Sequence, residues 1–132
     1  MKEYQISFDA AKLAYELGYR HTSRMGYVTQ WYHPITKRIM YCGRTGRCNI
    51  NTLYPIINQA LLQMWLRDVH QIMVFADIHK DIQADVNDDY EWYPRIVTTT
   101  TVINYNNHDF KSYEYALEAG LIRALELSKE LK

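Results

Sequence analysis

Residues 52–78 join an amphipathic helix directly to an apolar strand, and this pairing restricts the folds that the chain can adopt. Thr52 is the expected N-cap, Pro55 fits the first helical turn, and the helix is expected to continue to about His70. Its apolar stripe is expected to be Ile57, Leu61, Met64, Trp65 and Val69, with Asn58, Gln59, Gln63 and Arg67 facing water. The strand QIMVFADI, residues 71–78, follows at once. Because a helix stripe and a strand face bury their apolar sides against another layer, the pair predicts a layered fold.

Two further helices and two further strand regions complete the expected pattern. Helices are expected at 8–17 and 113–131, with Ser7 and Ser112 as N-caps, Gly18 as the stop of the first, and Gly120 permitting close packing of the last. Residues 27–32 and 38–42 predict a hairpin whose turn contains Pro34, and 91–105, including Thr98–Thr101, predicts a strand with Pro94 at its start or on an edge. The order α-β-β-α-β-β-α predicts a two-layer α+β fold, a mainly antiparallel sheet with helices packed on it, in a single domain over 1–132.

Charge is segregated along a chain whose formal net charge is zero, with 15 Lys and Arg against 15 Asp and Glu. From Leu17 to Arg67 there is no acidic residue and there are seven basic ones: Arg20, Arg24, Lys37, Arg38, Arg44, Arg47 and Arg67. From Asp68 to Pro94 there are seven acids and one base, Lys80. The zero is therefore a sum of opposite local charges, and it does not argue against an anionic partner.

The basic, aromatic segment 19–48 is the predicted ligand surface. Its loop CGRTGRC, residues 42–48, combines two glycines with two guanidiniums, a composition suited to holding an anion through backbone amides and arginine contacts. Neighbouring rings offer stacking surfaces for bases. The predicted binding residues are Arg20, Arg24, Tyr27, Trp31, Tyr41, Arg44 and Arg47. The expected partner is a nucleotide, a nucleic acid or an acidic protein. The alternative is a solvated hairpin whose aromatic residues pack on the helices.

Part of this segment resembles the two signature strands of GIY-YIG nucleases. Gly26-Tyr27-Val28 and Tyr41-Cys42-Gly43 match the two triplets loosely, and Arg47 matches the nearby arginine of the family. The resemblance implies an alternative function as a degenerate nuclease. The chain departs from the family pattern because no Glu lies between Glu16 and Glu91, so the carboxylate that would hold the metal ion is missing.

Other chemistry finds no support in the sequence, so we expect a non-enzymatic protein with no cofactor and no metal. Cys42, Cys48 and His33 lack zinc-site spacing, and the acidic stretch 77–89 lacks the glycine and terminal glutamate of a calcium-binding loop. No run of 18 apolar residues and no signal peptide are visible, which predicts a cytoplasmic protein with no membrane partner.

Three motifs together resemble small uncharacterised proteins of Bacteroidetes phages and prophages. They are FDAAKLAYELGY at 8–19, LLQMWLRDVHQIMV at 61–74 and SYEYALEAGLIRALEL at 112–127. The resemblance implies a phage-encoded protein that works in the cytoplasm of a bacterial host, for example as a binding protein that modulates the host. A further alternative is a homo-oligomeric interaction module, in which the basic segment of one copy meets the acidic segment of another.

Overall fold

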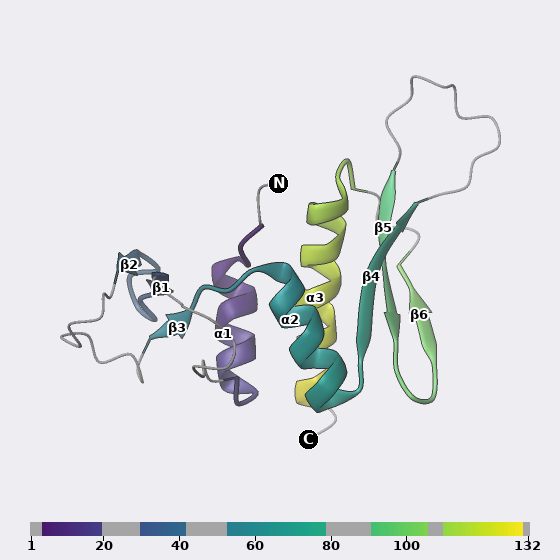
Figure 1. Ribbon diagram of the computed structural model, residues 1–132, viewed down its shortest axis with the longest axis horizontal. Helices are drawn as coiled ribbons and strands as arrows, with labels where there is room; N and C mark the ends of the chain where they lie inside the picture. Colours follow the sequence, from purple (N-terminus) through teal and green to yellow (C-terminus); the bar gives the residue numbers. More distant parts are fainter. Residues whose placement is uncertain (1–3, 20–29, 42–52, 79–90, 106–109, 131–132) are drawn as a thin grey trace.

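The structure is a computed structural model, and it describes residues 4–19, 30–41, 53–78, 91–105 and 110–130 (Figure 1). In chain order the elements are α1 (Phe8–Glu16), β1 (Gln30–Tyr32), β2 (Ile39–Tyr41), β3 (Tyr54–Pro55), α2 (Gln59–Trp65), the π-helical segment η3 (Leu66–His70), β4 (Met73–Ile78), β5 (Trp92–Val97), β6 (Val102–Asn104) and α3 (Tyr113–Glu130). The strands form two antiparallel sheets, ordered β2-β1-β3 and β4-β5-β6. The predicted α+β class, with helices packed on antiparallel sheet, is confirmed.

The larger sheet, β4-β5-β6, carries the helices on one face. Helix α3 packs against β4 and β5, and it approaches them closely at Gly120, since a Cβ there would lie 2.9 Å from Val74 Cγ1 and 3.1 Å from Pro94 Cβ. The buried strand residues Val74 and Ile96 meet the buried helix residues Leu117 and Leu121 in one apolar core. The close packing of α3 at Gly120 is therefore as predicted.

The smaller sheet, β2-β1-β3, lies at the other end of the long axis of the molecule, with the helices between the two sheets (Figure 1). The β1–β2 hairpin has the predicted turn: His33 N–H donates to Arg38 C=O, and Lys37 adopts a left-handed φ of 61°. Register pairs Trp31 with Met40 and Tyr32 with Ile39. Strand β3 completes the sheet by pairing with β1 on its other side.

The first and last helices, α1 and α3, begin at the predicted N-cap residues. Ser7 Oγ accepts a hydrogen bond from Ala10 N–H at the start of α1, and Gly18 follows the helix with a φ of 103°. Ser112 Oγ accepts from Tyr115 N–H at the start of α3. A residue with a short polar side chain at each start and a glycine after the first end set these boundaries locally.

Helix α2 corrects the prediction, because it begins at Gln59 with Asn58 as its N-cap instead of starting after Thr52. Residues 54–55 form β3, and the N-terminal segment holds the following residues extended through Ile6 N–H to Ile57 C=O and Gln59 N–H to Tyr4 C=O. The buried face is also rotated from the predicted one. It consists of Gln59, Leu62, Trp65 and Leu66, while Met64 and Val69 are exposed.

The segment 91–105 is a hairpin and not a single strand, so two predictions there are wrong. Thr98–Thr101 forms the turn between β5 and β6, because Thr98 Oγ1 accepts from the N–H of Thr101 and Thr98 N–H donates to its C=O. Pro94 lies in the central strand instead of at its start or on an edge. Its C=O accepts from Tyr105 N–H, so the missing N–H faces Tyr105, just past the end of β6, and the pairing of β5 with β4 loses no hydrogen bond. In the part of the chain that the structure describes, no helix has the length and apolarity to cross a bilayer.

Candidate functional site

Most of the predicted ligand residues fall outside the described part of the chain. These are Arg20, Arg24, Tyr27, Arg44 and Arg47. These residues fall in 20–29, which precedes β1, and in 42–52, which follows β2. The described hairpin therefore shows where both segments join the fold. Tyr41 is the backbone partner of Gln30 in this hairpin, one position from Trp31.

Trp31 has a packing role in the smaller sheet. Its side chain is 5 % exposed and forms a small apolar cluster with Leu53 and the half-buried Met40. This burial assigns the ring to the core of the sheet, and base stacking on Trp31 stays a prediction.

Aromatic side chains fill the interface between α1 and the smaller sheet. Phe8 lies 5.6 Å from the Tyr32 ring and 5.7 Å from the Tyr54 ring, and Tyr15 lies 5.1 Å from Tyr54. The Tyr32 hydroxyl donates to Ile6 C=O at 3.0 Å. Burial, and then the nearby Glu118 carboxylate, raises the pKa of Tyr32 above its ordinary value of 10.0. These tyrosines therefore join α1 to the sheet through their rings.

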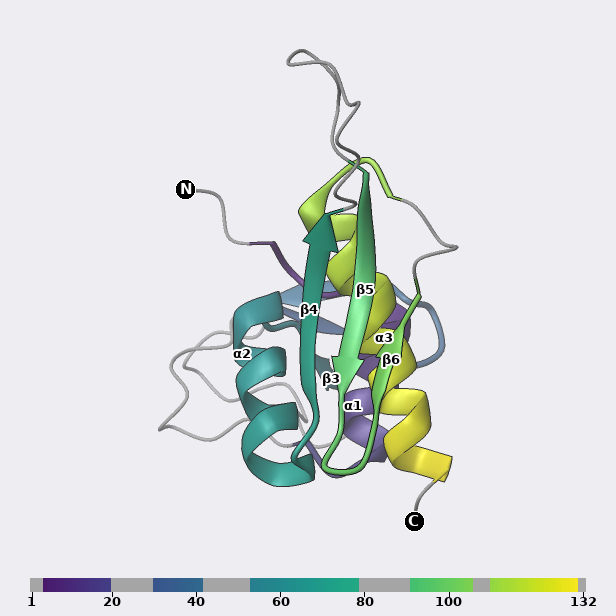
Figure 2. The ribbon, with the colours of Figure 1, turned by 90° about the vertical axis from the view of Figure 1, so that its right-hand side faces the viewer.

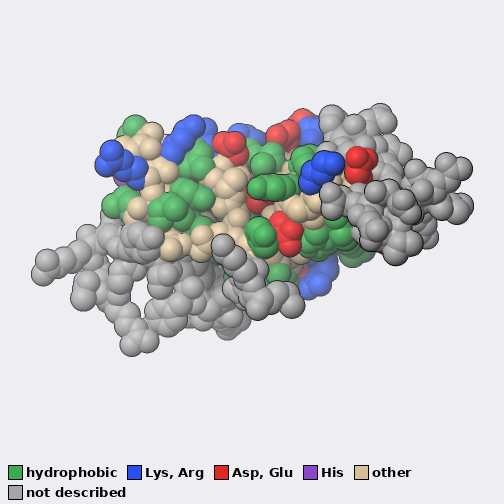
Figure 3. Space-filling view, turned by 90° about the horizontal axis from the view of Figure 1, so that it is seen from above, with side chains coloured by type: hydrophobic (Ala, Val, Ile, Leu, Met, Phe, Trp, Pro, Cys, Tyr) green, Lys and Arg blue, Asp and Glu red, His purple; other side chains and the backbone are tan. Residues whose placement is uncertain are grey.

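The hairpin tip, residues 33–39, exposes both apolar and basic side chains. Ile35 is 85 % exposed and Ile39 46 % exposed, with exposed Lys37 and Arg38 between them. The Lys37 ammonium lies 5.1 Å from the centre of the Phe8 ring, which holds the turn against α1. Figure 3 shows Lys, Arg and His side chains beside hydrophobic ones at this end of the molecule. The tip is thus an ordered, positively charged projection with an uncovered apolar residue.

A polar cluster of Ser7, Gln59 and Glu118 joins the three helices. Glu118 Oε2 accepts from the Ser7 N–H at 3.2 Å and from its hydroxyl at 2.8 Å. Gln59 Nε2 donates to Glu118 Oε1 at 3.3 Å and to Glu114 C=O at 2.9 Å. Ser7 and Gln59 lie at the starts of α1 and α2, and Glu118 of α3 accepts hydrogen bonds from both, so the cluster holds the three helices together. Sequence reasoning missed Gln59, since a polar residue in an amphipathic helix is normally assigned to water.

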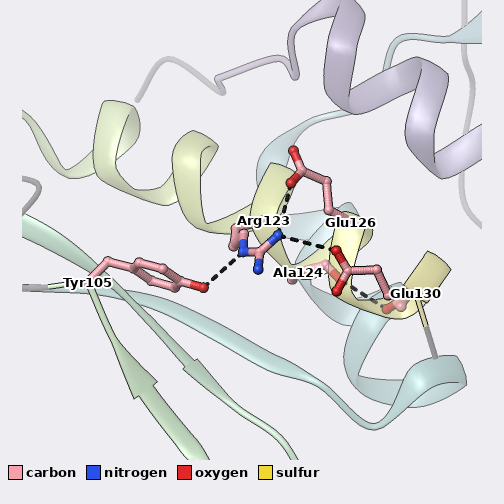
Figure 4. A network of polar contacts seen from close by, with 6 residues as sticks. Tyr105, Arg123, Ala124, Glu126 and Glu130 are labelled. Atoms are coloured by element: carbon pink, nitrogen blue, oxygen red, sulfur yellow. Dashed lines mark hydrogen bonds and ion pairs between the residues drawn. The ribbon is translucent and has the colours of Figure 1, made fainter.

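A second network joins the end of β6 to α3 (Figure 4). Arg123 Nε donates to the Tyr105 hydroxyl at 3.0 Å, and its Nη1 lies 3.1 Å from Glu126 and 3.7 Å from Glu130. These hydrogen bonds, with that to Tyr105 the largest cause, raise the pKa of Arg123 further above its ordinary range. The network holds Tyr105 over the helix and leaves the guanidinium engaged on the helix side of the sheet.

The opposite face of the larger sheet has no described element over it (Figure 2). Side chains alternate along strands, so the positions between the inward Val74, Pro94 and Ile96 point to this face. We call it the open sheet face; its residues are Met73, Phe75, Asp77, Tyr93, Arg95, Val97, Val102 and Asn104. Five of the eight are apolar or aromatic, whereas the solvated face of an antiparallel sheet is normally polar. Such a patch is typical of an interaction surface.

Chemistry changes along this face in rows set by the register. Met73, Val97 and Val102 form an apolar row beside the 98–101 turn. The next row is Phe75, Arg95 and Asn104, and the last pairs Asp77 with Tyr93. Arg95 Nη1 lies 3.8 Å from Asp77 Oδ2, and exposed Glu91 precedes the strand at this end. The face therefore runs from an apolar end to an acidic end.

A groove of about 360 Å³ continues the open sheet face past β4 to α2. Met64 of α2 and Arg67 of η3 line one wall, and Met73 and Phe75 of β4 line the other. Methionines adapt their shape to a partner surface, and here they supply exposed area at the edge of the sheet. Groove and face form one continuous surface because Met73 and Phe75 belong to both.

The chain matches no protein-family model, no curated protein and no solved structure. Within the described ranges, no group of three His, Cys, Asp or Glu side chains is placed to hold a metal ion.

Proposed function

We propose that this chain is a small non-enzymatic binding protein whose basic, aromatic segment 19–48 engages an anionic ligand. The resemblance of the motifs at 8–19, 61–74 and 112–127 to small phage and prophage proteins supports a phage- or prophage-encoded protein that acts in the cytoplasm of a bacterial host. The ligand class is a nucleotide, a nucleic acid or an acidic host protein.

One structural observation supports the proposal. Strands β1, β2 and β3, which border 20–29 and 42–52, lie at one end of the long axis, while β4 and β5, which border the acidic segment 79–90, lie at the other (Figure 1). Exposed charges separated by more than a Debye length, about 8–10 Å at physiological salt, interact weakly. In the described fold, the strands that border the basic segments therefore lie far from the strands that border the acidic segment. This separation favours an anion from outside the chain, and not the acidic segment, as the partner of the basic segments.

Native mass spectrometry of freshly purified protein tests the proposal, because it reports a retained ligand and the stoichiometry together. A nucleotide and a single-stranded oligonucleotide are then titrated against the protein and against Arg44→Ala/Arg47→Ala. Arg67→Ala is the matched control, since Arg67 is an exposed arginine outside the segment. We expect the double variant to lose binding at least tenfold and the control to retain it.

Equal binding by all three proteins contradicts the proposal, and no binding of either probe with no retained ligand excludes a nucleotide or a nucleic acid as the ligand. Metal-dependent cleavage of the oligonucleotide that is lost in Tyr41→Phe would instead support the nuclease alternative.

A further inference from the structure

Two described surfaces at opposite ends of the molecule have complementary chemistry. The hairpin tip presents exposed Ile35 and Ile39 with the cations Lys37 and Arg38 between them. The open sheet face presents an apolar row, Met73, Val97 and Val102, and at its other end Asp77, which is paired with Arg95 of the same face, with the exposed Glu91 just before β5. Each surface therefore offers apolar contact, and the two carboxylates at the end of the sheet face, against the single cation Arg95, complement the two cations of the tip.

We propose that the open sheet face binds the hairpin tip of a second copy of this chain, so that copies associate head to tail. The two surfaces cannot meet within one chain, because the helices separate the smaller sheet from the larger one (Figure 1). The contact is heterologous: each copy gives a tip and receives a tip, which produces rings or open chains of copies.

A symmetric pairing of two open sheet faces fits the residues less well. A two-fold axis along the strands superposes the rows, which places both acidic ends together. An axis across the strands puts the apolar row of one copy over Asp77 and Tyr93 of the other. The hairpin tip avoids both conflicts, because it carries positive charge and an uncovered isoleucine.

The edges of the larger sheet also favour contact through the face. Gln63 Nε2 donates to Val74 C=O at 2.7 Å, and Asp77 Oδ1 accepts from Ile78 N–H at 2.8 Å. Val74 and Ile78 lie on the side of β4 away from β5, so these side chains occupy groups that an added strand would need. Edge pairing is thereby hindered while the face stays open.

The size of the contact sets its strength. A seven-residue tip covers less than the roughly 800 Å² per partner of a standard stable interface, so the association is weak and depends on concentration. Sedimentation velocity from about 10 μM to about 1 mM spans the dissociation constants of such contacts. We expect the average mass to rise above the 15.7 kDa of one chain over this range, and to fall again when NaCl is raised to about 0.5 M, because the charged part is screened.

Two complementary variants make the test specific. Ile35→Asp blocks the tip and keeps the face, whereas Val102→Lys blocks the face and keeps the tip; both positions are exposed, so folding is retained. Each variant alone should stay monomeric at about 1 mM, and a mixture should form a complex of one copy of each. Tyr115→Asp is the control, because Tyr115 is 69 % exposed on α3 outside both surfaces, and it should associate like the parent chain.

A parent chain that stays monomeric at about 1 mM overturns the proposal. So does a mixture of the two blocked variants that stays monomeric, or continued association of either variant alone. Arg44→Ala/Arg47→Ala leaves both surfaces intact, so loss of anion binding without loss of association separates this inference from the proposed function.

Discussion

The close packing of α3 on the larger sheet predicts that Gly120→Ala changes the stability of the fold. The new Cβ would stand 2.9 Å from Val74 Cγ1 and 3.1 Å from Pro94 Cβ, closer than van der Waals contact permits. Val74 is a buried β-branched residue with a restricted χ1, and Pro94 is a rigid ring in the central strand. Neither neighbour has a low-energy way to withdraw, so the helix must shift from the sheet.

Two opposing contributions set the magnitude. Replacing a helical glycine by alanine stabilises the helix by about 1 kcal/mol. Overpacking a well-filled core costs about 1–3 kcal/mol, and the two stiff neighbours place this site in the upper half of that range. We expect a net loss of about 1.5 kcal/mol in the free energy of unfolding, which lowers the Tm by about 6 °C for a chain of this size.

Thermal and urea unfolding of four proteins measures this effect: the parent, Gly120→Ala, Val74→Ala and the double variant. Val74→Ala removes the Cγ1 atom that makes the shorter contact, so Gly120→Ala should be close to neutral in that background. The expected coupling between the two sites is about 1–2 kcal/mol. A Tm that rises in Gly120→Ala, or an equal loss in both backgrounds, would refute the steric reasoning.

Three further predictions concern tyrosine and glutamine side chains that are buried or half-buried. Burial raises the pKa of Tyr19 and of Tyr32 above 10.0, so their contribution to stability is present below pH 10.0 and is lost as pH rises through the folded-state values; the free energy of unfolding should fall above that pH. In Glu118→Gln, absorbance titration should show a lower pKa for Tyr32, and an unchanged value would contradict the electrostatic contribution. Gln59→Ala should cost about 1–3 kcal/mol in urea unfolding, because Glu114 C=O and Glu118 lose a buried donor; a loss below about 0.5 kcal/mol would show that water replaces it.

Elements whose boundaries depend on neighbouring residues were predictable from the sequence. Ser7 and Gly18 bracket α1, Ser112 starts α3, and the turn with Pro34 forms the hairpin. Each signal acts within a few residues, so sequence reasoning captures it.

The start of α2 was not predictable in the same way. Thr52, Pro55 and Asn58 all permit a helix start. The helix starts after Asn58 because Tyr4 and Ile6, near the N-terminus, hydrogen-bond to the backbone on either side of it. The turn at Thr98–Thr101 was missed for another reason: threonine favours strands through its branched Cβ, but here its hydroxyl accepts from the backbone and closes a turn.

The candidate surfaces were predictable only in part. The charge segregation and the hairpin are visible in the sequence. The open sheet face is not, because it is defined by the packing of Gly120 against Val74 and Pro94, which fixes the strand residues that point to α3. Within the apolar segment QIMVFADI, Met73 and Phe75 point away from the helices and are exposed, a placement that the run of apolar residues does not indicate.

The distribution of apolar residues over the larger sheet argues that its face, and not its edge, is the surface for contact. Gln63 and Asp77 occupy backbone groups along β4, and β6 has three residues, so both edges offer little to an added strand. Polar residues at positions 73 and 102 would hinder contact through the face, as the occupied backbone groups hinder contact through the edge. Met73 and Val102 are instead apolar and exposed. With its edges blocked and one face apolar, the larger sheet can contact a partner only through that face. The proposed partner segment, the hairpin tip 33–39 of a second copy, has the exposed apolar and basic side chains that suit such a contact.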